Sequence, residues 1–253
     1  AFQAGWDLWE PGDAAGDQNH SSDWGQYGDI QLGDFERSEM WIDRAGDVLA
    51  NNPGDPRSTG TLKTMKARHI IETEQWQTYE LTDSLSTDEL LALGLSAANL
   101  GDLNLAQSVT DRLETLASQS PGNITLNLIS MEVSALTMFK KGQEEEAIEL
   151  LMDAISIAES QSPPRGAASP LKPVHELAGD LLLTMGSHDK AAALYEASLG
   201  RMANRPRALL GAARSYAGMD DDYNARQRYQ AFYSLWKDND IAEIHETERY
   251  LGL

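Results

Sequence analysis

Glu176 and Asp180 come closest to a reactive pair of side chains in this sequence. Residues four apart share one face of a helix, so these two carboxylates could bind a divalent cation or act as an acid and a base. His175 adjoins them in sequence but would point about 100° away around a helix. In the simpler interpretation, both carboxylates are solvated or paired with arginines of a neighbouring unit, such as Arg205 or Arg207.

The remaining reactive residue types form no recognisable catalytic pattern. None of the five histidines makes a closely spaced metal-binding pair, and the sequence has no HExxH, GxSxG, GxGxxG or phosphate-loop motif. Cysteine is absent, which excludes disulfides, thiolate metal sites and a cysteine nucleophile. We therefore predict that the protein is not an enzyme and has no catalytic residues, metal site or cofactor.

The segment from His175 to Leu199 defines the elements that would position such side chains. It reads as two short amphipathic helices joined at Gly186, where a positive φ has no Cβ clash. Small residues at Gly179 and Ala191 would let the two helices approach closely. Tyr195 would fill the space between them, so the segment predicts a helical hairpin.

The same pattern recurs along the chain, with Gly33, Gly101, Gly142 and Gly218 in the place of Gly186. It resembles the tetratricopeptide repeat, which has a period of about 34 residues. The resemblance covers residues 20–236. It implies an all-α solenoid of five to six hairpins in a right-handed superhelix, with residues 1–19 as an N-terminal segment or cap and residues 237–253 as a C-terminal capping helix.

Several boundaries follow from turn and capping residues. The run from Asn51 to Gly60 predicts a linker, and Ser86 with Glu89 predicts a capping box. We expect the second unit to be truncated, because the polar residues 77–86 replace its second helix. Residues 161–169 predict a loop over the surface, followed by a helix that begins at Pro170.

The resemblance also implies a concave groove lined by the first helix of each unit. Carried over position by position, it gives the candidate partner-binding residues Tyr27, Arg68, Asn99, Glu132, Phe139, Lys140, Glu176, Asp180, Arg205 and Tyr216. This groove would be acidic in the middle, with basic points at Arg68, Lys140 and Arg205. Such a surface suits an extended peptide or a helix of a protein partner.

The charge balance limits the possible partners. The 253 residues include 20 Lys and Arg against 40 Asp and Glu, a net charge of −20. This charge argues against nucleic acid and anionic membrane surfaces as partners. No apolar run approaches the roughly 18 residues that predict a membrane span, so we expect no membrane insertion. The acidity, the absence of cysteine and the start at Ala1 favour an extracytoplasmic setting without fixing the compartment.

These observations predict a non-catalytic scaffold that binds a protein or peptide in its groove. Two alternatives remain open. In the first, the groove carboxylates Glu132, Glu176 and Asp180 bind a small ligand or a divalent metal, or belong to part of an enzyme. In the second, the tryptophan-rich ends and terminal repeats lead to self-assembly into an oligomer.

Overall fold

The computed structural model describes residues 2–13 and 15–253, and those residues form thirteen helices and no strand. The helices are α1 (Phe2–Asp7), α2 (Ala15–Gln31), α3 (Phe35–Asn51), α4 (Pro56–Thr73), α5 (Thr87–Leu100), α6 (Leu103–Gln119), α7 (Ile124–Lys140), α8 (Glu144–Glu159), α9 (Val174–Thr184), α10 (His188–Arg201), α11 (Pro206–Gly218), α12 (Asp222–Trp236) and α13 (Ala242–Leu251). The protein is an α-solenoid built from the hairpins α2/α3, α5/α6, α7/α8, α9/α10 and α11/α12, with α4 inserted as a single helix.

Local sequence explains most of the helix boundaries. Ser86 and Glu89 form the predicted capping box at the start of α5. Gly101, Gly142 and Gly186 follow the first helices of their hairpins with φ between 75° and 85°. Only a residue without a Cβ adopts this conformation at little cost, which is why the hairpin turns recur at glycine.

Close helix packing depends on small residues opposite one large ring. Tyr195 of α10 is 1% exposed and lies against both Gly179 of α9 and Gly211 of α11. A Cβ at Gly211 would stand 2.2 Å from the Tyr195 ring. One aromatic side chain therefore joins two successive hairpins. The contact of Tyr195 within its own hairpin, α9/α10, is the one that the sequence pattern around Gly186 predicts.

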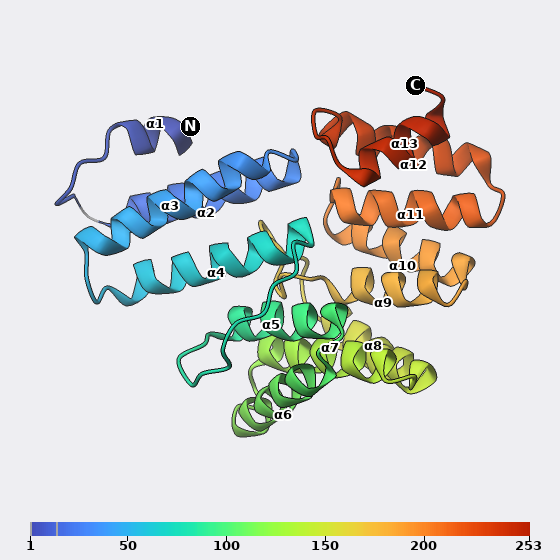
Figure 1. Ribbon diagram of the computed structural model, residues 1–253, viewed down its shortest axis with the longest axis horizontal. Helices are drawn as coiled ribbons and strands as arrows, with labels where there is room; N and C mark the ends of the chain where they lie inside the picture. The colour runs from blue at the N-terminus through green and yellow to red at the C-terminus, as the bar shows by residue number, and fades with distance from the viewer. Residues whose placement is uncertain (1, 14) are drawn as a thin grey trace.

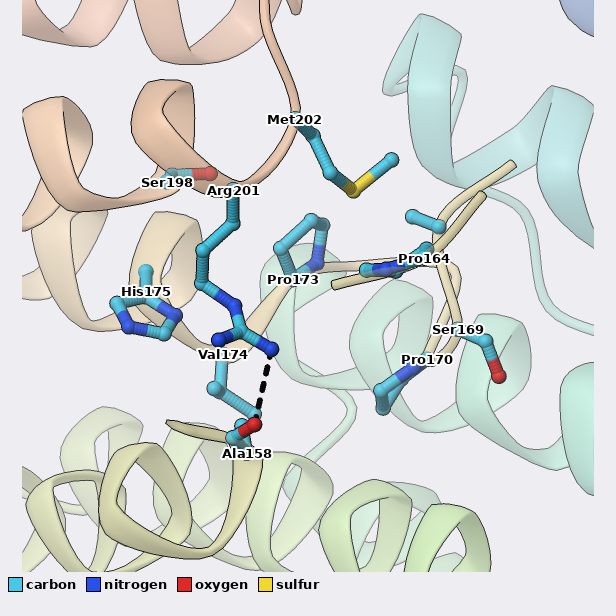
Figure 2. A pocket seen from close by; sticks show the side chains of 11 residues that line it. Ala158, Pro164, Ser169, Pro170, Pro173, Val174, His175, Ser198, Arg201 and Met202 are labelled. Carbon is cyan, nitrogen blue, oxygen red and sulfur yellow. Dashed lines mark hydrogen bonds between the residues drawn. The ribbon is translucent and has the colours of Figure 1, made fainter. Parts of the chain in front are cut away.

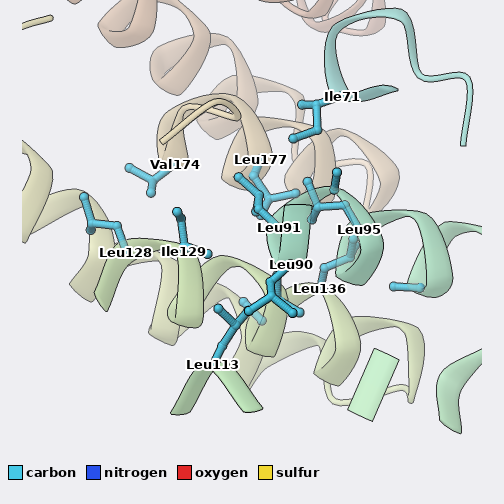
Figure 3. Packing of buried hydrophobic residues seen from close by; sticks show 14 of the residues in the cluster. Ile71, Leu90, Leu91, Leu95, Leu113, Leu128, Ile129, Leu136, Val174 and Leu177 are labelled. Carbon is cyan, nitrogen blue, oxygen red and sulfur yellow. The ribbon is translucent and has the colours of Figure 1, made fainter. Parts of the chain in front are cut away.

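The largest apolar core runs without interruption from α4 to α9. Figure 3 shows Leu90 and Leu91 of α5 beside Leu113, Ile129 and Leu177, which come from three other helices. Each of these side chains is at most 4% exposed. The core is thus a continuous layer between stacked hairpins.

The second unit has one helix instead of two. α4 is followed by an extended segment, residues 74–86, which projects beside α5 in Figure 1. Trp76, Tyr79 and Leu85 of this segment pack against the main core. The segment partly substitutes for the helix that the other units have.

Two predicted boundaries were wrong. The linker is only four residues long, because Asp55 caps α4 and Pro56 occupies its first position. Pro170 does not begin a helix either, since α9 starts at Val174 after Pro173. Leu171 and Lys172, which lie between Pro170 and Pro173, are buried in the molecule and do not lie on its surface.

The solenoid bends into an arch whose first and last hairpins touch. Figure 1 shows α2–α4 and α11–α13 at the two sides of the arch, with α5–α8 below them. Trp236 of α12 donates its indole N–H to the Gln31 carbonyl at 3.3 Å and meets Phe35 edge-on at 5.1 Å. In a regular solenoid each repeat contacts only its neighbours. The contacts between the first and last hairpins are therefore not part of the regular repeat packing.

The N-terminal segment also packs onto the first hairpin. α1 contacts α2, and Trp6 stacks on Trp9 with ring centroids 5.2 Å apart. The guanidinium of Arg44 lies over the rings of Trp6 and Trp41. Among the described residues, no helix is long and apolar enough to cross a membrane.

Candidate functional site

The concave side of the arch carries an ion cluster, composed of Glu72, Arg205 and Glu176. Arg205 Nε donates to Glu176 Oε1 at 2.5 Å, and its Nη1 lies 3.0 Å from Glu72 Oε1. The three residues are 3%, 2% and 0% exposed, respectively. Burial alone would raise the pKa of Glu176, but the Arg205 guanidinium more than offsets it, so the pKa lies below its usual value.

Lys172 and Glu132 extend this cluster toward the centre of the molecule. Lys172 Nζ lies 2.6 Å from Asp180 Oδ2, and the surrounding carboxylates raise the pKa of this lysine despite its burial. Glu132 is fully buried, and neither of its carboxylate oxygens has a hydrogen-bond partner among the residues that the structure describes. Burial therefore raises the pKa of Glu132 well above its usual value.

Four of the predicted partner-binding residues are consequently inaccessible. Arg68, Glu132, Glu176 and Arg205 are each at most 3% exposed. Arg68 is held by Asp23 at 2.7 Å and by Gln26 at 2.8 Å. The structure thus contradicts the prediction that these four face a partner. Arg68 is covered by the neighbouring helix α2, and Glu132 lies beside Lys172 of the loop between α8 and α9. Glu176 and Arg205 are buried together with Glu72, which the curvature of the arch brings over them from α4.

The two predicted tyrosines have separate environments. Tyr27 lies beside Arg68, whose guanidinium is 5.9 Å from its ring, and faces Glu72 and Arg205 of the ion cluster. Tyr216 is directed toward α10, where its hydroxyl donates to Glu196 at 3.3 Å. Neither residue lines the open part of the concave face.

The loop between α8 and α9 fills much of the remaining concave surface. Ala168, Leu171 and Lys172 are at most 6% exposed, and Gly166 lies against the Trp24 ring of the first hairpin. Figure 2 shows this loop beside α9 and α10, with Arg201 donating to the Ala158 carbonyl at 2.9 Å. The chain therefore occupies part of its own groove.

An open hollow of about 280 Å³, the concave hollow, remains between α5, α7, α9 and α11. It brings together four of the predicted residues, Asn99, Phe139, Lys140 and Asp180. Six leucines contribute apolar surface to its floor, although five of them are at most 4% exposed. They are Leu95, Leu136, Leu177, Leu181, Leu183 and Leu210.

Polar groups surround this apolar floor. Asn99 and Lys140 are exposed at the ends of α5 and α7. Opposite them, Arg207 pairs with Glu243 at 3.0 Å, and Arg214 forms an ion pair with Glu246 at 2.6 Å. The concave hollow thus offers amide and cationic groups beside an apolar surface, a combination that can hold a peptide segment.

Sequence reasoning missed several residues of the concave hollow. Trp76 and Glu74 line it from the extended segment, and Lys172 lines it from the loop. None of them belongs to a regular first helix, so the repeat pattern gives no signal for them. A tryptophan and a lysine inside proline-rich or irregular segments were the only indications available.

Each of the carboxylates of Glu176 and Asp180 is paired with a cation of the protein, so the two do not form a shared binding site. Glu176 is bound by Arg205, and Asp180 by Lys172 and by the Tyr195 hydroxyl at 2.6 Å. Within residues 2–13 and 15–253, no group of three acidic or histidine side chains is placed to hold a metal ion. The pairing of Glu176 with Arg205 is the one that the simpler interpretation named.

Repeated hairpins, small residues at their crossings and a concave hollow define an α-solenoid of the tetratricopeptide type. The chain is similar to the structure of TTC0263, a thermophilic TPR protein of Thermus thermophilus, with 18% identity and a TM-score of 0.50 over 85% of this chain and 100% of the other. It also matches MamA of AMB-1 at 18% identity over 83% of this chain and 97% of the other, but the TM-score of 0.39 supports no argument. At these identities the likeness shows the fold alone.

No family model matches the sequence, and no curated protein does.

Proposed function

We propose that the protein is a non-catalytic scaffold that binds an extended segment of a protein partner in the concave hollow. The observation that supports this most directly is the composition of that hollow. It is a hollow of about 280 Å³ with leucines in its floor and with Asn99 and Lys140 exposed at its edge. Main-chain groups of a peptide would bond to the amide, while its apolar side chains would rest on the leucines.

The charges at the hollow favour a segment with at least one acidic side chain. Lys140 lines it without an ion pair among the described residues, whereas Lys172, Arg207 and Arg214 are paired with Asp180, Glu243 and Glu246. Lys140 is therefore the cation that an acidic side chain of the partner would meet, in a chain whose net charge is −20. Charge complementarity of this kind selects partners and speeds association more than it raises affinity.

A site-specific photocrosslink tests this proposal. We would place a benzophenone amino acid at Asn99 and, as a matched control, at Asp153, which is exposed on α8 away from the hollow. A partner from the native source should crosslink at position 99 only, and Lys140→Glu should reduce the yield. Equal crosslinking at both positions would contradict the proposal.

Light scattering of the same purified chain measures its mass in solution and so tests the alternative of self-assembly. A monomer that still crosslinks a different protein at position 99 supports the scaffold. A crosslink to a second copy of the chain, together with a doubled mass, would contradict the scaffold proposal and support self-assembly into an oligomer.

A further inference from the structure

The middle of the loop between α8 and α9 reaches across to the first hairpin. This loop segment, residues 162–169, forms neither helix nor strand and includes Pro163 and Pro164. Its Gly166 lies against the ring of Trp24 on α2, so closely that an added Cβ would stand 2.4 Å from that ring. The loop segment lines no part of the concave hollow.

The two ends of the loop segment are held firmly. On one side Arg201 donates to the Gln161 carbonyl at 3.2 Å. On the other side Lys172 is buried and forms its ion pair with Asp180 at 2.6 Å. The chain is therefore anchored before and after the loop segment, and the segment between these anchors can be considered by itself.

The loop segment itself is held by packing alone. Within residues 2–13 and 15–253, no hydrogen bond or ion pair joins residues 162–169 to the rest of the chain. A hollow of about 40 Å³ lies beneath it, between Pro164, Ala168 and Met202, and is large enough to hold water (Figure 2). A segment with so few attachments can leave its place without unfolding the helices around it.

Trp24 is a suitable surface for an extended peptide. Its ring is half-buried on the first helix of its hairpin, with the His20 ring 6.0 Å away. Aromatic side chains in grooves bind proline-rich segments, because these are extended before binding and lose little entropy. The close approach at Trp24 also requires glycine, which Gly166 supplies.

We propose that the loop segment is an internal ligand of a second binding site, centred on Trp24, and that a proline-containing extended segment of a partner protein displaces it. The partner segment would place a glycine against the Trp24 ring, as Gly166 does here. A tethered segment has an effective concentration of about 1 mM. The loop segment therefore competes with the partner and lowers its apparent affinity.

A synthetic peptide of residues 161–170, added to the full chain, tests this proposal. In the chain variant Gly166→Ala, the new Cβ would push the loop segment off Trp24 and leave the site free. We expect this variant to bind the peptide with a Kd of about 1 mM or lower, seen as a shift of the Trp24 indole N–H signal in NMR. The unaltered chain should bind it about tenfold more weakly.

Gly122→Ala is the matched control. Gly122 lies in another exposed turn, and no atom is within 4 Å of its added Cβ, so this variant should bind the peptide no better than the unaltered chain. Adding Lys140→Glu to Gly166→Ala should leave the binding unchanged, because Lys140 lines the concave hollow. Failure at Trp24 is thus distinguishable from failure of the function proposed for that hollow.

The peptide and the ring supply the specificity test. The same peptide with Gly166→Ala should bind the chain variant about tenfold more weakly, since overpacking costs it the close approach. Adding Trp24→Ala to the chain variant should abolish binding, with its fold checked by circular dichroism. No binding to Gly166→Ala at about 5 mM peptide would overturn the proposal. Equal affinity for the two peptides, or equal binding by the Gly166→Ala and unaltered chains, would do so as well.

Discussion

Glu72 and Arg205 are 133 residues apart in the sequence and form an ion pair that is almost fully buried. The pair joins the end of α4 to the start of α11, while Arg207 adds a hydrogen bond to the Glu72 carbonyl at 2.9 Å. It therefore connects the two sides of the arch at the point where the concave face closes.

Removal of Glu72 should open the arch. Glu72→Gln leaves the charge of Arg205 only partly compensated, and breaking a buried ion pair by removing one partner costs about 3–5 kcal/mol. We expect a lower unfolding free energy by urea titration and a larger radius of gyration by small-angle X-ray scattering. Glu80→Gln is the control, because Glu80 is exposed and forms no ion pair among the described residues, so its loss should alter neither measurement strongly.

Glu132 should make the protein less stable as the pH rises. Its pKa is raised in the folded state above the ordinary value of 4.5, so its stabilising contribution is complete below about pH 4.5 and is lost as the pH approaches the raised pKa. The loss amounts to at most about 1.4 kcal/mol per pH unit.

Glu132→Gln should remove this dependence and raise the unfolding free energy at pH 7 relative to the unaltered chain. Urea titrations at pH 5 and pH 8 measure the effect. Glu144→Gln, which changes an exposed carboxylate in the first turn of α8, serves as the control. An unchanged pH slope in Glu132→Gln would show that this carboxyl group is not protonated in the folded state.

Gly211→Ala should destabilise the junction of the last two hairpins. The added Cβ would meet the Tyr195 ring at 2.2 Å, and overpacking of this kind costs about 1–3 kcal/mol. Gly200→Ala is a matched control in α10, because no atom lies within 4 Å of its added Cβ. It should instead stabilise the helix by up to about 1 kcal/mol. Thermal unfolding of both variants distinguishes packing from helix propensity.

Arg201→Ala should loosen the loop that fills the concave face. Arg201 donates to the carbonyls of Ala158 and Gln161, at 2.9 and 3.2 Å, where α8 ends and the loop begins. Without it we expect faster hydrogen exchange of residues 161–172. Arg165→Ala alters an exposed arginine within the same loop and should leave the exchange rates unchanged. Equal rates in both variants would mean that other contacts hold the loop.

The parts of this fold that depend on nearby residues could be predicted from the sequence. Gly186 ends a helix and Ser86 begins one for reasons contained within a few residues. The contact of Gly179 with Tyr195 follows from the same spacing, because both residues belong to one hairpin.

The closure of the arch could not be predicted in this way. The meeting of Glu72 with Arg205 depends on the sum of small rotations between hairpins, and no single segment encodes that sum. The inward turn of Lys172 likewise depends on carboxylates from distant elements, Asp180 of α9 and Glu74 of the extended segment among them. Glu132, Glu176 and Arg205 were therefore placed on an accessible groove when the folded chain buries them, while Arg68 is buried against its neighbour α2.

The contact of Trp236 with Gln31, across 205 residues, also limits how such a protein can evolve. An open solenoid lengthens freely when a hairpin is duplicated, because each new unit simply continues the stack. Here an extra hairpin between α5 and α10 would carry Trp236 away from Gln31 and Arg205 away from Glu72. The number of repeats is consequently a fixed property of this chain, as the number of strands is in a closed barrel.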